Sequence, residues 1–229
     1  MPASPLFIFD LDNTLYPRGL PIWRMVDDRI ELYVMQRLGV DAESARSVRM
    51  EYLADYGSTL RGLMRHHGVL PEEYLEYVHD VPISGIVQAR PELKEMLAGL
   101  PGKRVVFTNG SLDYANRVLA ALGVADMMEE IFGIEFMEYN AKPSLYPYEK
   151  LLKATGAVAK DSLFCDDSRR NLLPAYEMGI FTVQVGESVD PPKALLMKAP
   201  PPSFRPHAVI GDICDLPDVL HAFPPLAKA

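Results

Sequence analysis

The stretch Leu6-Phe7-Ile8-Phe9-Asp10-Leu11-Asp12-Asn13-Thr14-Leu15 decides the fold of this chain. Its first four residues are apolar and stop at a carboxylate, a pattern typical of a buried strand that ends at one edge of a sheet. A buried carboxylate is costly unless it pairs with a cation or a metal ion. Because Asp10 and Asp12 place two carboxylates there, we interpret this edge as a site that handles phosphoryl groups.

The length and composition are those of a globular protein. With 229 residues, 48% of them hydrophobic, the chain can form one large domain or a core domain with a smaller insert. No apolar run approaches the ~18 residues of a membrane helix, and the N-terminus lacks the features of a signal peptide, so we expect a cytoplasmic protein outside the membrane. Cys165 and Cys214 form no CxxC motif and are expected to be reduced thiols. The net charge of -8 argues against a nucleic-acid polymer as partner but is compatible with a small anionic ligand.

Helical periodicity after the first strand predicts an all-helical insert. Four helical segments are separated by glycines: Ile22–Leu38, Asp41–Asp55, Thr59–His67 and Pro71–His79. This insert is expected to form a cap domain at residues 17–89.

From residue 90 onward, short apolar strands alternate with helices of about ten residues, which indicates βαβ units and a parallel sheet. The predicted strands here are Arg104–Thr108, Ile131–Glu135, Ser162–Cys165, Phe181–Val185 and Ala208–Ile210, and a last helix is expected at Asp215–Ala222. We interpret the proline-rich segment 191–206 as a surface loop. The sequence therefore predicts an α/β fold, with a doubly wound, Rossmann-like parallel sheet formed by residues 1–16 and 90–229.

Polar residues follow the predicted strands at the ends where doubly wound sheets bind their ligands. Asp10 and Asp12 follow the first strand, Thr108-Asn109-Gly110 ends the second, and Asp166-Asp167 follows Ser162–Cys165. Lys142 lies in a loop between two core elements. We expect these groups to converge on one rim, where the Thr108 hydroxyl and the amides of Asn109 and Gly110 would hold phosphoryl oxygens.

The chemistry of phosphoryl transfer fits this set of residues. A phosphate ester dianion repels nucleophiles, so its transfer depends on charge neutralisation and positioning. The Asp10 and Asp166 carboxylates are oxygen ligands of the kind that Mg²⁺ prefers. With the metal and Lys142 screening the phosphate, Asp10 can attack phosphorus and form an aspartyl-phosphate. Asp12 can protonate the leaving alkoxide and then activate the hydrolytic water.

This ordered set resembles the motifs of the haloacid dehalogenase superfamily of phosphatases. The resemblance is carried, in the family's order, by Asp10-Leu11-Asp12-Asn13-Thr14, Phe107-Thr108-Asn109-Gly110, Lys142-Pro143 and Asp166-Asp167. It implies that Asp10 is the nucleophile, and that Asp12 is the general acid/base and offers its backbone carbonyl to Mg²⁺. It further implies that Asp166 binds the metal, and that Asp167 either binds the metal or contacts the residues that bind it. The insert looks like that family's helical cap.

Within the superfamily, the chain looks most like the pyrimidine 5′-nucleotidase branch. This second resemblance is carried by Asp12-Asn13-Thr14-Leu15-Tyr16 and Tyr56-Gly57-Ser58-Thr59-Leu60-Arg61-Gly62-Leu63. The loop Asp166-Asp167-Ser168 followed by Asn171 fits it too, although many relatives share this loop. It implies a pyrimidine nucleoside 5′-monophosphate as substrate. Tyr56, Trp23 and Arg24 are the cap residues that we expect near it. The expected partner is thus a small phosphorylated metabolite, bound by a monomer or a homodimer.

Other interpretations stay open at this point. The substrate can also be a sugar phosphate, phosphoglycolate or another small ester. A dehalogenase is disfavoured, because a halide leaving group needs no acid at Asp12. A phosphoacceptor signalling domain is disfavoured by the chain length, by the helical insert and by the acid two residues after Asp10. Asp167 can cap the helix that begins near Ser168 as readily as it can bind a metal.

Overall fold

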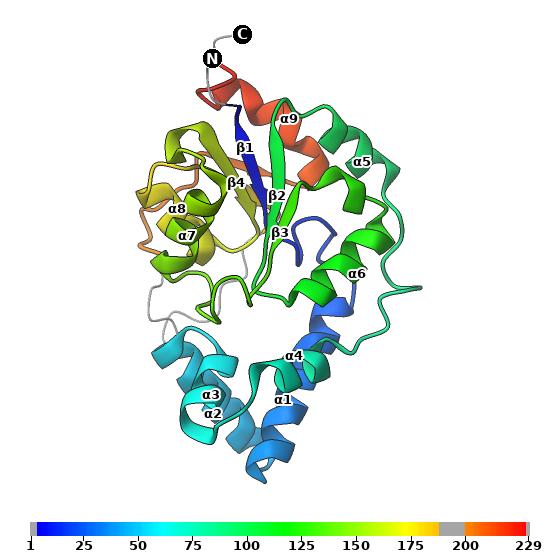
Figure 1. Ribbon diagram of the computed structural model, residues 1–229, viewed down its shortest axis with the longest axis vertical. Helices are drawn as coiled ribbons and strands as arrows, with labels where there is room; N and C mark the ends of the chain where they lie inside the picture. The colour runs from blue at the N-terminus through cyan, green and yellow to red at the C-terminus, as the bar shows by residue number, and fades with distance from the viewer. Residues whose placement is uncertain (1–3, 188–199, 228–229) are drawn as a thin grey trace.

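A six-stranded parallel sheet forms the centre of the protein, as a computed structural model that describes residues 4–187 and 200–227 shows (Figure 1). Its strand order is β3-β2-β1-β4-β5-β6, and every neighbouring pair is parallel. The strands are β1 (Leu6–Phe9), β2 (Lys103–Phe107), β3 (Glu130–Phe132), β4 (Ser162–Asp166), β5 (Phe181–Val185) and β6 (Ala208–Ile210). The predicted doubly wound sheet is confirmed.

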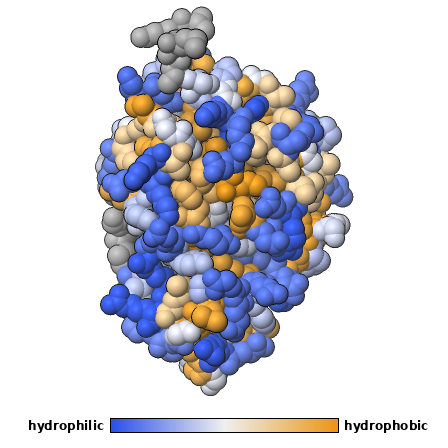
Figure 2. Space-filling view, viewed as in Figure 1, coloured by the Kyte–Doolittle hydropathy of each residue, from blue (hydrophilic) through white to orange (hydrophobic). Residues whose placement is uncertain are grey.

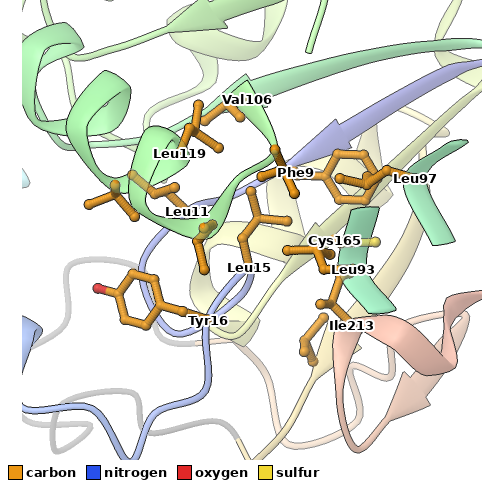
Figure 3. Close-up of a cluster of buried hydrophobic side chains, with 14 of the residues drawn as sticks. Phe9, Leu11, Leu15, Tyr16, Leu93, Leu97, Val106, Leu119, Cys165 and Ile213 are labelled. Carbon is orange, nitrogen blue, oxygen red and sulfur yellow. The ribbon is translucent and has the colours of Figure 1, made fainter. Parts of the chain in front are cut away.

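Each face of the sheet is covered by helices, because the side chains of β1 alternate between two apolar clusters. Phe7 and Phe9 pack with α5 (Pro91–Ala98), α6 (Leu112–Leu122) and α9 (Leu216–Val219). Leu6 and Ile8 pack on the other face, with α7 (Leu145–Thr155) and α8 (Arg169–Glu177). Figure 3 shows the first cluster, in which Phe9, Leu97 and Leu119 surround the segment that leaves β1.

Four helices beyond the carboxyl ends of the strands form the predicted helical insert (Figure 1). They are α1 (Ile22–Leu38), α2 (Ala42–Tyr56), α3 (Thr59–His67) and α4 (Pro71–His79). Asp41 caps α2, where its carboxylate accepts the Ser44 amide at 2.9 Å. We call these four helices the cap. Their own packing includes a tight contact at Gly62, where an added Cβ would overlap the Tyr52 ring.

Two predicted elements are wrong in extent. The strand predicted at Ile131–Glu135 ends at Phe132, because the Ile134 amide bonds the Gly110 carbonyl (2.9 Å) and so leaves the sheet. The helix predicted at Asp215–Ala222 is broken into three short pieces, Ile213–Asp215, Leu216–Val219 and Leu220–Ala222. An Asp212–Asp215 capping box begins the first of them as a 3₁₀ turn.

The proline-rich segment predicted as a surface loop is described only in part. Residues 191–199 lie outside the described residues, and residues 200–206 contain no helix or strand. Phe204 in this stretch is nevertheless buried, with its ring 5.4 Å from that of Tyr176. The described part is therefore anchored to α8 by an aromatic contact.

Hydrophobic and hydrophilic side chains are interspersed on the face of the molecule shown in Figure 2. The large exposed hydrophobic residues include Trp23 on α1 and Leu70 before α4. Among the residues that the structure describes, none of the helices is long and apolar enough to cross a bilayer.

Candidate active site

The two central strands deliver the principal carboxylates. Asp10 directly follows β1, and Asp166 is the last residue of β4, its neighbour in the sheet. The Asp10 amide donates to the Cys165 carbonyl at 2.9 Å, so the two backbones stay paired up to the acids. From β1 the strand order continues through β2 and β3 on one side, and through β4, β5 and β6 on the other. The direction of the strand order therefore reverses between β1 and β4, and doubly wound sheets bind their ligands at such a point.

A buried ammonium joins these carboxylates. Lys142 Nζ lies 2.8 Å from Asp10 Oδ1 and 2.9 Å from Asp166 Oδ2, and it donates to the Phe107 carbonyl at 2.7 Å. The side chain is fully buried. Burial disfavours its charge, but the two carboxylates outweigh burial and raise the pKa of Lys142 above its ordinary value. Lys142 is therefore a fixed positive charge.

Asn109 holds the loop that carries Lys142. Its side-chain amide donates to the Lys142 carbonyl at 3.1 Å, and its Oδ1 accepts the Lys142 amide at 2.8 Å. This pair of bonds ties the end of β2 to a loop more than thirty residues later. The side chain of Asn109 thus positions the lysine, a role that the sequence did not indicate. The phosphate contact through its backbone amide stays a prediction.

Asp10 and Asp166 are also held by neutral donors. Thr14 Oγ1 donates to Asp10 Oδ2 at 3.1 Å and accepts the Asp167 amide at 3.2 Å. Asp166 accepts the Ser168 amide at 2.8 Å and the Asn171 side-chain amide at 3.1 Å. The carboxylates are thus oriented by bonds from several elements, a precondition for a precise site.

Three carboxylates form a cluster that fits a divalent cation. One oxygen from each of Asp10, Asp166 and Asp167 lies within 4.8 Å of the others. Burial raises the pKa of Asp166 and Asp167, and nearby acids raise both further. Lys142 and the more exposed Arg18, 3.6 Å from Asp167, neutralise only part of this charge. Three hard oxygen ligands with excess negative charge suit Mg²⁺.

The Asp12 carboxyl lies apart from that cluster. Its Oδ1 accepts from Tyr16 OH at 2.5 Å and from Tyr114 OH at 2.7 Å. Burial and the nearby Asp10 carboxylate raise the pKa of Asp12 to about 6, although the two phenols oppose the shift. An acid with such a pKa can both give and take a proton near neutral pH.

Neither tyrosine was identified from the sequence as a site residue. Tyr16 is the last residue of the segment 12–16, and the resemblance of that segment to a family branch gives the tyrosine no role. Tyr114 lies within a helix whose apolar face indicates core packing. Figure 3 shows the Tyr16 ring at the border of the apolar cluster, with its hydroxyl on the side away from Ile213.

Hydrogen bonding and close packing fix the loop after β2. The Gly110 amide donates to Thr108 Oγ1 at 3.0 Å, so this amide has a partner within the loop. Its role as a phosphate contact stays a prediction. A Cβ on Gly110 would lie 3.0 Å from the Tyr114 ring and 3.4 Å from Thr108 Oγ1. Glycine is needed here to make room for those two side chains. The Thr108 hydroxyl is buried and keeps its own hydrogen to donate.

Comparison with known proteins agrees with the fold and the motifs. Residues 5–179 match the family model of haloacid dehalogenase-like hydrolases. The chain belongs to that family. A relative from Saccharomyces cerevisiae, phosphate metabolism protein 8, is 26% identical over 200 residues, which are 78% of this chain and 60% of the yeast protein. The chain thus spans about 60% of the length of this curated relative.

Solved structures of haloacid dehalogenase-like hydrolases share the fold. A predicted phosphoglycolate phosphatase from Haemophilus somnus is similar with a TM-score of 0.61 and 18% identity, over 94% of this chain and 97% of that one. The L-2-haloacid dehalogenase from Xanthobacter autotrophicus gives a TM-score of 0.57 at 18% identity, over 95% and 98% of the chains. At these identities the likeness shows the fold alone.

The cap residues predicted near the substrate of this haloacid dehalogenase-like hydrolase differ in their exposure and in their bonding partners. The Tyr56 hydroxyl bonds His66 Nε2 at 2.6 Å within the cap. Trp23, in the first turn of α1, is 43% exposed, and Arg24 beside it is exposed as well. Two exposed side chains at the start of α1 leave their role as substrate contacts a prediction.

Proposed function

We propose that this hydrolase is a Mg²⁺-dependent phosphomonoesterase that acts through an aspartyl-phosphate on Asp10. The observation that carries the proposal is the separate placement of the second acid. Asp12 lies two residues from Asp10 but is held by two phenols outside the carboxylate cluster. Release of an alkoxide from phosphorus needs a proton donor, whereas release of a halide needs none. The separate acid therefore favours a phosphatase over a dehalogenase.

The residues that would hold the metal are Asp10, Asp166, Asp167 and the Asp12 carbonyl. Bound there, Mg²⁺ would neutralise charge on the carboxylates and on the phosphoryl oxygens. Lys142 supplies a second positive charge, because its ammonium contacts Asp10 directly. The Thr108 hydroxyl would donate to a phosphoryl oxygen.

The reaction then uses the two acids in turn. Asp10 attacks phosphorus in line, and the bond between phosphorus and the leaving oxygen breaks as Asp12 gives that oxygen a proton. In the second half, the Asp12 carboxylate takes a proton from water as the water attacks the aspartyl-phosphate. This step releases phosphate and regenerates both acids.

The substrate class that we propose is a small phosphorylated metabolite, and specifically a pyrimidine nucleoside 5′-monophosphate. The support is the likeness of the segments 12–16 and 56–63 to the pyrimidine 5′-nucleotidase branch. The segment 56–63 spans the junction of α2 and α3. Its Arg61 side chain bonds the Asn140 side chain of the core loop that precedes Lys142, so this part of the cap lies over the site.

A second candidate substrate is phosphoglycolate or another small phosphate ester. It is favoured by the structural likeness to a protein described as a predicted phosphoglycolate phosphatase. The name of the yeast relative, phosphate metabolism protein 8, fits both candidates.

A panel of phosphomonoesters tests this proposal. The full chain is assayed with Mg²⁺ for phosphate release from UMP, CMP, AMP, phosphoglycolate, a hexose phosphate and p-nitrophenyl phosphate, with 2-chloropropionate as a dehalogenase control. We expect the highest kcat/KM with UMP or CMP. Faster hydrolysis of phosphoglycolate or the hexose phosphate would overturn the nucleotide preference. Chloride release without phosphate release would overturn the phosphatase.

A further inference from the structure

The Asp12 side chain is bound by two phenols through only one of its oxygens. Tyr16 OH and Tyr114 OH donate to Oδ1 at 2.5 and 2.7 Å, while the two phenol oxygens are 3.4 Å apart. The bonds to the carboxylate are much shorter than the contact between the phenols. Both phenols are therefore donors to Oδ1 rather than to each other.

Two donors fill the acceptor capacity of Oδ1. A carboxylate oxygen has two lone pairs in its plane, so a proton added to Oδ1 would displace one of the phenols. The second oxygen, Oδ2, has no such pair of donors among the described contacts. A proton carried by Asp12 without breaking this arrangement therefore resides on Oδ2.

The two phenols come from different elements and are themselves fixed. Tyr16 follows β1 and is fully buried in the apolar cluster of Figure 3. Tyr114 lies in the first turn of α6, whose N-terminus is capped by Ser111. The His79 ring stacks on Tyr114 at 4.6 Å and 18°, and His79 Nδ1 is 3.1 Å from Ser111 Oγ. On another side, Gly110 leaves room for the Tyr114 ring.

We infer that Tyr16 and Tyr114 are positioning residues that hold Asp12 by Oδ1, so that Oδ2 delivers the proton to the leaving group. This inference rests on the proposed phosphomonoesterase function. In the step, the O–H bond at Oδ2 breaks, a new O–H bond forms on the leaving oxygen, and the electron pair of the broken P–O bond stays with that oxygen. Asp12 is left as a carboxylate that both phenols stabilise.

The cap also contacts one of the two phenols. His79 is the last residue of α4, so the ring that packs on Tyr114 belongs to the helical insert. The cap therefore contributes to the orientation of a core acid through one aromatic contact, besides any contact with substrate.

The test compares leaving groups in Tyr16→Phe, Tyr114→Phe and the double variant. Tyr33→Phe is the matched control, because its buried phenol also donates to a carboxylate, Glu73 at 3.1 Å, but within the cap. For each variant, kcat/KM is measured with UMP, whose alkoxide needs a proton, and with p-nitrophenyl phosphate, whose phenolate leaves readily. This parameter covers the steps up to leaving-group departure, so slow hydrolysis of the aspartyl-phosphate does not mask the effect.

We expect the ratio of kcat/KM for UMP to that for p-nitrophenyl phosphate to fall on the order of tenfold in each single variant. The fall should be larger in the double variant and absent in Tyr33→Phe. An equal loss with both substrates, or an unchanged ratio, would overturn the inference. If the wild type hydrolyses neither ester, the proposed function itself fails. A crystal structure of the double variant then decides the positioning, since Asp12 in an unchanged rotamer contradicts it.

Discussion

Lys142 Nζ lies 2.8 Å from Asp10 Oδ1, so the proposed nucleophile is paired with a fully buried cation. The same ammonium reaches Asp166 at 2.9 Å. A buried ion pair is sensitive to loss of one partner, because the other charge is then left uncompensated. Substitutions at Asp10 therefore have to preserve its hydrogen bonds if they are to report on chemistry rather than on folding.

Asp10→Asn meets that condition. The amide oxygen can still accept from Lys142, but an amide does not attack phosphorus. We expect turnover of UMP to fall to background while Mg²⁺-dependent binding of UMP, measured by isothermal titration calorimetry, survives. Asp55→Asn, at an exposed position of α2, serves as the control and should keep full turnover. Normal turnover in Asp10→Asn would remove the nucleophile role.

Asp12→Asn should slow the reaction in another way. The variant keeps an acceptor oxygen for the two phenols but has no proton to exchange, so we expect kcat to fall by the ~10²–10⁴-fold typical of lost acid/base catalysis. The loss should be smaller with p-nitrophenyl phosphate than with UMP when kcat/KM is compared. A variant with wild-type kcat would show that Asp12 is not the acid.

Mg²⁺ should stabilise the fold through the carboxylate cluster. A ligand at a hundredfold excess over its Kd stabilises a protein by about 2.7 kcal/mol, so Mg²⁺ should raise Tm measurably and excess EDTA should reverse the rise. Asp167→Asn removes one oxygen of the cluster at its more exposed side and should weaken this response. In Asp55→Asn the response should be unchanged. Equal responses of Asp167→Asn and the wild type would exclude Asp167 as a ligand.

His79 should make the stability depend on pH. Burial lowers the pKa of His79 to about 4 from 6.5, and the nearby Arg117 adds to the shift. Between these values the unfolded chain binds more protons than the folded one, so the free energy of unfolding falls as the pH drops through 6.5 toward 4. Between pH 7 and pH 5, His79 lowers the free energy of unfolding by about 2 kcal/mol.

Urea unfolding of His79→Gln checks this expectation. The variant should lose about 2 kcal/mol less than the wild type over that pH interval. The same pH dependence in both proteins would contradict a neutral buried His79.

Gly62→Ala should destabilise the cap, against the usual preference of a helix for alanine. The added Cβ would overlap the Tyr52 ring, and overpacking of this kind typically costs ~1–3 kcal/mol. Gly99→Ala is the control, because the Cβ there meets backbone oxygens only at 3.4 Å or more. Thermal unfolding should show a lower Tm for Gly62→Ala alone. A Tm at or above that of the wild type would show that α2 and α3 separate without cost.

The sequence was sufficient for the sheet and for the acids at its strand ends. An apolar run that stops at Asp10 or Asp166 is a local signal, and the rule for parallel strands brings such ends together. The sequence predicted that Lys142 lies near these acids, but it did not predict that the side chain is buried. A lysine in a loop carries no local sign that two carboxylates will enclose it.

Contacts between residues distant in sequence account for what was missed. Tyr114 bonds Asp12 from 102 residues away, and in its own helix it has the spacing of a core residue. His79 likewise ends a cap helix with no local indication that it stacks on a core tyrosine. At Gly110, the sequence does not show that the Tyr114 ring fills the space beside the glycine.

The order of the strands also bears on how the protein folds. β1 pairs with β2 and β4, so Leu6 pairs with Lys103 and Ser162, and the whole cap lies between Leu6 and either partner along the chain. The helices α1–α4, in contrast, follow one another closely in the sequence. Local contacts form sooner than distant ones, because closing a long loop costs chain entropy before it gains contacts. We therefore expect the cap helices to collapse early and the pairing of β1 to come late. Catalytic competence would then appear last in refolding, so recovery of activity would lag behind recovery of helical circular dichroism.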